Sequence, residues 1–227
     1  MTRDSVLWKD RRAAGLQLAE RLRPWAHQAQ TSTVIGLPRG GVAVAAAVAE
    51  HLQLPLASWS VRKLALPSAP EYALGALAAP DVVVWNPGAW GAARLNASER
   101  QALVEAARPE LERRRQRFGD PEPGDLRGRR LIVVDDGIAT GMTVRAALQA
   151  LRRCEPAELV LAVPVLDQRL ASELSPLVDA LIAVAIVSGL KAVGLYYSDF
   201  SQVSDRMVER LLQAKKSTAN GSARAMG

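Results

Sequence analysis

Short, continuously apolar runs recur along the chain and are separated by polar, turn-forming residues. They are rich in Val, Ile and Leu, which is typical of strands that are buried on both faces of a sheet. The predicted strands cover residues 33–38, 55–64, 81–86, 129–136, 158–165 and 179–187. Because stretches with helical spacing lie between them, the pattern predicts an α/β fold, a parallel twisted sheet with helices on both faces.

Residue spacing also predicts where several helices lie. A small-residue helix (VAVAAAVAEHL, 42–52) follows the first strand, and an amphipathic helix follows the run LIVV. A long helix is predicted from about Ser98 to Phe118, opened by Ser98 with Gln101 at the spacing of a capping box. Pro109 lies inside this helix and is expected to kink it.

Two segments lack a regular pattern. Residues 64–80 are rich in Pro, Ala and Gly and predict a loop or hairpin excursion, the kind of segment that closes over a ligand. Residues 215–227 are small and polar and are expected to be disordered. Residues 1–214 are therefore predicted to form one domain, with its sheet core within about 31–188.

Composition limits the class of protein. The net charge is +6, and only five of the 29 basic residues are lysine, so arginine, which binds phosphate groups bidentately, predominates. The single cysteine, Cys154, excludes an internal disulfide framework. The start of the chain has no apolar run of signal-peptide length, and the run 177–187 is too short to span a membrane. We expect a soluble, cytoplasmic protein with a phosphate-bearing ligand, and nucleic acid stays open as the less favoured alternative.

Two adjacent carboxylates, Asp135 and Asp136, follow the strand LIVV and precede a turn and a helix. Ligands of open parallel sheets bind beyond the carboxyl ends of strands. An NTPase would also need a glycine-rich loop ending in Gly-Lys-Ser/Thr, which this sequence lacks, and the glycines of GLPRGG do not have the dinucleotide-binding spacing. A glycosidase pair faces across a bond, whereas neighbouring strand residues point to opposite sides.

A sugar phosphate does fit this arrangement. Two acids at a strand end can accept hydrogen bonds from the vicinal hydroxyls of a ribose. The stretch ATGMT then supplies a glycine for a tight turn, N–H groups at a helix start, and the hydroxyls of Thr140 and Thr143, all of which suit a phosphate. One continuous piece of backbone is thus predicted to bind a ribose diol and its 5′-phosphate.

The stretch LIVVDDGIATGMT (131–143) resembles the phosphoribosyl pyrophosphate (PRPP) motif of type I phosphoribosyltransferases at thirteen consecutive positions. The resemblance implies PRPP binding by Asp135, Asp136, Gly137, Ala139, Thr140, Gly141, Met142 and Thr143. Similar stretches such as DRRAAGLQLAERL and YYSDFSQVSD extend the likeness over most of residues 3–212. It implies the family's Rossmann-like core and a small hood formed by residues 1–30 and 189–212.

A second stretch, VIGLPRGGVAVAAAVAEHL, resembles the family's pyrophosphate-binding loop. In that interpretation Arg39 and the backbone N–H groups of Gly40 and Gly41 bind pyrophosphate, because two glycines let the backbone approach the anion closely. By itself a Gly-Gly helix start more often marks only a tight connection. Arg62 and Lys63 end the next predicted strand, and similar basic residues in the family help to neutralise pyrophosphate.

The implied reaction is displacement of pyrophosphate at C1 of PRPP by a nitrogen nucleophile. Catalysis would come from positioning and from stabilisation of the leaving group by Arg39, Arg62 and Lys63. Mg²⁺ is the expected cofactor, held mainly by PRPP oxygens and near Asp135 and Asp136 through water or ribose hydroxyls. The expected partners are PRPP and a small-molecule acceptor, and the expected assembly is a homodimer.

The resemblance does not identify the acceptor. Members that act on 6-oxopurines carry Asp where this chain has Ala139, so hypoxanthine and guanine are disfavoured. In the hood, Tyr196, Tyr197 and Phe200 either stack on a flat acceptor or, in the favoured interpretation, form the hood's own core. The alternative function is a non-catalytic sensor of PRPP or nucleotides that regulates RNA or transcription, and a weaker one is a hydrolase of sugar phosphates.

Overall fold

The computed structural model describes residues 6–66, 68–69, 72–86, 88 and 95–224, with side chains described up to residue 214. A five-stranded parallel sheet forms its centre, in the order β2-β1-β6-β7-β8. The bounds are β1 Ser32–Gly36, β2 Leu56–Ser58, β6 Arg130–Val134, β7 Glu158–Asp167 and β8 Ala180–Val187. The prediction of a parallel α/β sheet is confirmed.

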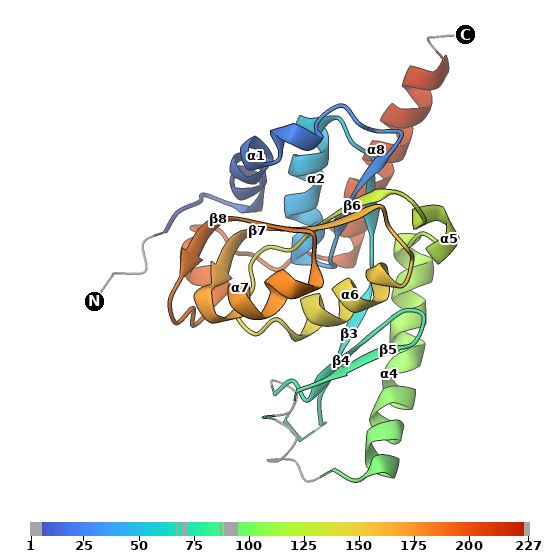
Figure 1. The fold of residues 1–227 in the computed structure, drawn as a ribbon, viewed down its shortest axis with the longest axis vertical. Coiled ribbons are helices and arrows are strands. Elements are labelled where there is room, and N and C mark those ends of the chain that lie inside the picture. Colours follow the sequence, from blue (N-terminus) through green and yellow to red (C-terminus); the bar gives the residue numbers. More distant parts are fainter. Residues whose placement is uncertain (1–5, 67, 70–71, 87, 89–94, 225–227) are drawn as a thin grey trace.

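Helices cover both faces of this sheet (Figure 1). One face carries α1 (Arg11–Arg21), α2 (Gly40–Leu52) and α8 (Asp205–Arg224), and the other carries α6 (Met142–Arg152) and α7 (Gln168–Leu174).

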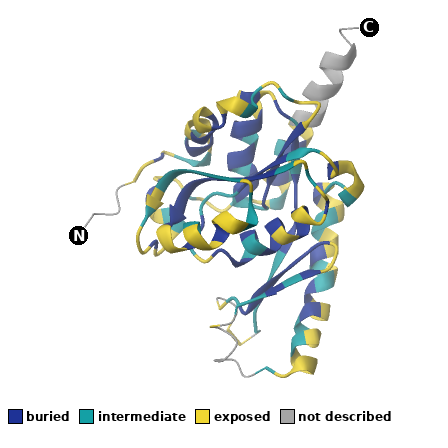
Figure 2. Cartoon of the chain, in the orientation of Figure 1, coloured by how far each residue is buried: buried dark blue, intermediate teal, exposed yellow. Residues whose placement is uncertain are grey.

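Alternate residues of β6 serve the two faces: Ile132 packs toward α1, α2 and α8, whereas Leu131 packs toward α6 and α7. Both side chains are fully buried, and burying one such side chain stabilises the fold by roughly 1.5–3 kcal/mol. Figure 2 shows the same burial along the central strands. Because both faces are covered, the strands are continuously apolar.

A second, antiparallel sheet joins β3 (Val61–Leu64), β4 (Gly75–Ala78) and β5 (Val82–Trp85). The predicted single strand 55–64 is therefore wrong: it divides into β2, in the parallel sheet, and β3. Asp120 stabilises the division, because its carboxylate accepts hydrogen bonds from Ser58 Oγ and from Ser60 N, both at 2.6 Å. Within the unpatterned segment 64–80 the described residues include all of β4, and residues 67 and 70–71 lie outside them.

The long helix α4 (Ala97–Phe118) packs on this second sheet through Val104, Ala107 and Leu111. Its predicted start is wrong by two residues. Asn96 Oδ1 accepts from Glu99 N at 3.0 Å and Glu99 Oε2 accepts from Asn96 N at 2.8 Å, so this pair, and not Ser98 with Gln101, forms the capping box.

The remaining elements of the described residues are four short helices. They are η1 Arg23–Trp25, α5 Pro123–Leu126, η2 Ser175–Leu177 and η3 Val193–Tyr196. Helix α8 continues to Arg224, into the segment that was expected to be disordered, and its far end projects from the body (Figure 1). None of the helices in the described part of the chain is both long and apolar enough to cross a membrane.

The two predicted hood segments lie side by side. Leu7 N donates to Tyr196 O, and Ser198 N donates to Trp8 O, so the chain before α1 pairs with the chain after η3. Their apolar side chains form a cluster with Val165 near the carboxyl end of β7.

Candidate functional site

Two loops meet at the carboxyl ends of β1 and β6, which are neighbouring strands in register at Gly36 and Val134. The first loop leads from β1 into α2, and the second leads from β6 into α6. Gly41 packs on the second loop so closely that a Cβ there would lie 2.7 Å from Val134 O and 2.9 Å from Asp135 Cα. A Cβ on Gly40 would lie 1.9 Å from Asp136 Oδ2. The two predicted binding motifs therefore form one continuous surface, and only glycine fits at the contact.

The two strand-end carboxylates are largely covered. Asp135 Oδ1 accepts from Asp136 N at 2.9 Å, and Asp136 Oδ2 accepts from Arg11 Nε at 2.8 Å. Burial, reinforced by the charge of Asp136, raises the pKa of Asp135 well above its ordinary value. Burial also raises the pKa of Asp136, while the Arg11 cation opposes that rise.

Arg11 is a site residue that the sequence reasoning missed. It comes from the first turn of α1, and its side chain is only 12 % exposed. Its guanidinium carbon lies 3.9 Å from the centre of the Phe200 ring, and its Nη1 donates to Ser201 O at 2.9 Å. Arg11 therefore links both hood segments to Asp136. No local pattern distinguishes it from the adjacent Arg12, which pairs with Glu50 at the surface.

The turn after Asp136 is anchored at its centre by Ile138. Ile138 N donates to Val165 O at 3.0 Å, and Ile138 O accepts from Asp167 N at 3.1 Å. The turn ends at Gly141, which has a φ of +74° and forms the N-cap of α6 without a capping side-chain hydrogen bond. Such a helix start presents backbone N–H groups and a favourable dipole to an anion.

The remaining residues predicted for this turn surround that helix start. Thr140 is exposed, Ala139 and Thr143 are half-buried, and Met142 is buried as the first residue of α6. Gly137 lies at the inner side, where a Cβ would be 2.6 Å from Val193 Cγ1. A hollow of about 470 Å³ borders the turn on its other side, between α6, α7 and the end of β5.

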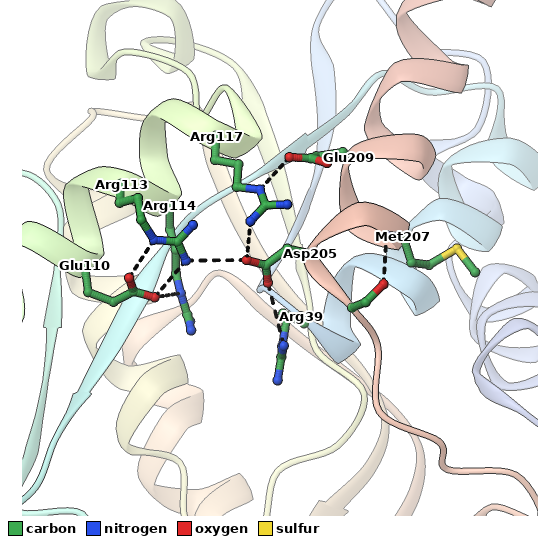
Figure 3. A network of polar contacts seen from close by, with 9 residues as sticks. Arg39, Glu110, Arg113, Arg114, Arg117, Asp205, Met207 and Glu209 are labelled. Atoms are coloured by element: carbon green, nitrogen blue, oxygen red, sulfur yellow. Dashed lines mark hydrogen bonds and ion pairs between the residues drawn. The ribbon is translucent and has the colours of Figure 1, made fainter.

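Arg39 lies at the N-cap of α2, after a cis peptide bond from Pro38. Its side chain is 32 % exposed and is directed toward α8, where its Nη1 lies 3.6 Å from Asp205 Oδ1 (Figure 3). The structure thus places Arg39 on the loop that contacts Asp136, with its guanidinium paired to the start of α8.

Arg62 and Lys63 lie on the antiparallel sheet, both half-buried, and not on the parallel sheet. They line a hollow of about 470 Å³ between β3, the residues that follow it, and Leu103, Ala106 and Ala107 of α4. None of the residues that line this hollow comes from the turn after Asp136.

The three hood aromatics belong to one apolar cluster, in which Tyr197 contacts Asp136 and Phe200 contacts Arg11. Tyr196 and Tyr197 are buried, and the Tyr197 ring lies 5.3 Å from that of Trp8 and 5.0 Å from that of Phe200, centre to centre. Tyr197 Oη donates to Asp136 O at 2.6 Å. Burial raises the pKa of the Tyr197 phenol, and the charge of Asp136 adds to that rise. Tyr197 therefore holds the backbone of the candidate site.

A preformed metal cage is absent from the described residues, which contain no cluster of three or more His, Cys, Asp or Glu side chains suited to a metal ion. The oxygen donors at the strand end are the two carboxylates of Asp135 and Asp136. Magnesium in proteins takes one or two carboxylates and completes its shell with water and substrate phosphates, so this donor set fits an ion carried mainly by a phosphorylated substrate.

Known proteins resemble this chain over most of its length. Residues 12–188 match the phosphoribosyl transferase domain family. Two Mycobacterium tuberculosis proteins that carry a provisional phosphoribosyl transferase name are 40 % identical over 209 residues, which cover 91 % of this chain and 46 % of each relative. The chain thus spans about half the length of these curated relatives.

Solved structures show the same fold. The protein TT1426 from Thermus thermophilus is similar at 35 % identity with a TM-score of 0.72, over 92 % of this chain and 99 % of that protein. AQ2163 from Aquifex aeolicus has a TM-score of 0.50 at 10 % identity, over 90 % of this chain and 85 % of that protein, and supports the fold alone.

Proposed function

Because this chain belongs to the phosphoribosyltransferase family, we propose that it binds PRPP with Mg²⁺ and transfers its phosphoribosyl group to a nitrogen nucleophile. The contact between Gly40 and Asp136 carries the proposal. It places the loop that resembles a pyrophosphate-binding loop in direct contact with the two strand-end acids. The turn after those acids leads to the N-terminus of α6 at Gly141, which has no capping side chain. Pyrophosphate, ribose diol and 5′-phosphate occur in the same order in PRPP.

In this proposal each part of PRPP has its own partners. Backbone N–H groups of the turn and of the α6 start, with the hydroxyls of Thr140 and Thr143, bind the 5′-phosphate. Asp135 and Asp136 accept hydrogen bonds from the ribose hydroxyls and, directly or through water, hold Mg²⁺, which supplies neutralising charge to the phosphate oxygens when it is bound. Arg39 with the N–H groups of Gly40 and Gly41 binds the pyrophosphate.

The chemical step needs no covalent intermediate. The acceptor nitrogen forms a bond to C1 while the C1–O bond to pyrophosphate breaks, pyrophosphate leaves with the electron pair, and the nitrogen releases a proton. Negative charge builds on the leaving group, so Arg39 and the two glycine N–H groups stabilise it most where charge develops. Arg62 and Lys63 add positive charge from the second sheet.

Ala139 narrows the acceptor class. Its half-buried methyl packs against the hood cluster and has no group that exchanges a proton, so 6-oxopurines are the disfavoured acceptors. Of Tyr196, Tyr197 and Phe200, only Phe200 is half-buried and not fully buried, and one side of its ring lies against Arg11. We place the acceptor at this hood face, with Phe200 as its stacking partner and with Tyr196 and Tyr197 as supports behind it.

Phosphorus NMR of the purified protein with PRPP, Mg²⁺ and a pool of nucleobases and small amines tests the proposal. Pyrophosphate should accumulate only when the pool is present, and dividing the pool then identifies the acceptor. Release of pyrophosphate at the same rate without any acceptor would instead identify a hydrolase.

A non-catalytic sensor of PRPP or nucleotides is the second candidate. The ion pair between Arg11 and Asp136 favours it, because a hood cation already occupies one of the acids that would bind ribose. In that case the PRPP resonances should shift or broaden without release of pyrophosphate, and any RNA or DNA bound should dissociate steeply with salt.

A further inference from the structure

Asp205, the first residue of α8, lies at the centre of an arginine cluster (Figure 3). Arg117 Nη1 lies 2.9 Å and Arg113 Nη2 3.4 Å from its Oδ2, both reaching across from α4. Arg39 approaches its other oxygen, Oδ1, at 3.6 Å. One carboxylate, only 18 % exposed, therefore joins the loop before α2, the long helix α4 and the start of α8.

The carboxylate is held from α4 more tightly than from Arg39. Arg113 is itself fixed by Glu110 at 2.7 Å, and Arg117 is fixed by Glu209 at 2.5 Å. The contact between Arg39 and Asp205 is longer than a hydrogen bond. Asp205 therefore orients the guanidinium of Arg39 by charge and leaves the N–H donors of that group able to bind an anion. Asp205 is thus held in place by Arg113 and Arg117, and Arg39 is its more loosely bound partner.

Helix α4 connects this anchor to the second sheet. Leu111, Ala107 and Val104 pack against Leu64 and Leu77, which belong to β3 and β4. Strand β3 also carries Arg62 and Lys63. Asp205 therefore fixes Arg39 relative to the same helix that supports the other two basic residues assigned to pyrophosphate.

We propose that Asp205 is a positioning residue for pyrophosphate binding, acting through Arg39. The inference rests on the proposed function and deepens it, since it assigns a role to a hood residue outside both sequence motifs. A bare carboxylate beside a pyrophosphate would repel it. Here Arg113 and Arg117 neutralise Asp205 from the α4 side, so its effect on the bound anion is exerted through the direction of the Arg39 side chain.

The test compares Asp205→Asn with Glu209→Gln. Both substitutions remove one carboxylate that α8 presents to Arg117, but Glu209 pairs with Arg117 and not with Arg39. Binding of Mg²⁺-pyrophosphate and of ribose 5-phosphate is measured for each by calorimetry, with thermal unfolding alongside. Asp205→Asn should lose about tenfold in pyrophosphate affinity, as expected for two coupled contacting groups, and stay within about twofold for ribose 5-phosphate. Glu209→Gln should match the wild type for both ligands.

Two further variants separate a positioning role from a structural one. Asp205→Glu keeps the charge and should recover most of the pyrophosphate affinity. In the background Arg39→Ala, the substitution Asp205→Asn should cause no additional loss, because the residue through which it acts is gone.

The outcomes are distinct. Unchanged or stronger pyrophosphate binding by Asp205→Asn, or an equal loss for both ligands, overturns the positioning role while leaving the proposed function intact. A wild-type protein that binds neither Mg²⁺-pyrophosphate nor PRPP overturns the proposed function, and the role of Asp205 falls with it.

Discussion

Gly40 lies directly against the carboxylate of Asp136, although α2, β2, the whole antiparallel sheet, α4, α5 and β6 lie between the two loops along the chain. The contact is made because β1 and β6 are neighbours in the sheet and end in register. It fixes how far the proposed pyrophosphate-binding loop lies from the acids, so this contact is the first feature to test.

Gly40→Ala should disrupt the candidate site. The new Cβ would lie 1.9 Å from Asp136 Oδ2 and 3.1 Å from Arg11 Nε, so the carboxylate must move. We expect a stability loss of about 1–3 kcal/mol, typical of overpacking, and a larger loss of PRPP affinity. Thermal unfolding and calorimetric PRPP titration measure the two effects. Gly124→Ala is the matched control, because outside its own stretch of chain no atom of the described residues lies within 4 Å of its Cβ position.

Arg11→Met should destabilise the folded protein by about 1–3 kcal/mol, since it leaves a largely covered carboxylate without its cation. Arg12→Met removes an ion pair from the same helix turn, but Arg12 and Glu50 are 62 % and 54 % exposed, so its effect should be below about 1 kcal/mol. Urea denaturation of both variants measures the difference. Equal losses would contradict the special position of Arg11.

Stability should depend on pH through Asp135. Its pKa is raised in the folded state, mainly by burial, so its contribution to stability is fully present below the ordinary value of 3.8 and is lost as pH rises through the raised pKa. Asp135→Asn should therefore stabilise the protein relative to the wild type at neutral pH, and the advantage should disappear toward pH 4. An advantage that is constant with pH would show that the carboxyl does not titrate in this way.

The contribution of Glu110 to stability should depend on pH in the opposite direction to that of Asp135. Hydrogen bonds from Arg113 and then Arg114 lower its pKa from the ordinary 4.5 to about 2. Its contribution is present above the ordinary value and is lost as pH falls from about 4.5 toward 2. Glu110→Gln should therefore cost stability at pH 7 and little at pH 2, as measured by denaturation at the two pH values.

Asp136→Asn should weaken PRPP binding roughly tenfold or more while the protein stays folded, because a ribose hydroxyl loses a charged acceptor. Asp199→Asn is the control: its carboxylate accepts from Ser201 in the same hood region but does not lie at a strand end. Isothermal titration with Mg²⁺-PRPP compares them. Affinity unchanged by Asp136→Asn would remove the ribose assignment.

The sequence predicts the parallel sheet well because strands such as LIVV, buried on both faces, are continuously apolar. It also predicts both loops, whose glycines are required by close packing. The division of 55–64 into two strands was not predicted, since it depends on Asp120, a residue distant in sequence. The cap of α4 was missed because two overlapping capping patterns occur within three residues.

The roles of Arg11 and Asp205 could not be predicted from the sequence either, because both depend on contacts with residues that are distant along the chain. Arg11 and Asp136 are 125 positions apart, and only the folded chain brings them within 2.8 Å. In a chain with 29 basic residues, no local pattern identifies the one that reaches a strand-end carboxylate.

The contact between Gly40 and Asp136 also restricts how such a protein can diversify. Neither position can gain volume unless the other yields, so the two must vary together or not at all. In the hood, Gly194 and Phe200 restrict each other in a similar way, since a Cβ on Gly194 would lie 2.9 Å from Phe200 Cδ1, but the nearby Ser198 and Ser201 are exposed. Directed evolution toward new acceptors should therefore hold residues 39–41 and 135–141 constant, together with Arg11 and Tyr197, and randomise exposed hood positions such as Ser198 and Ser201.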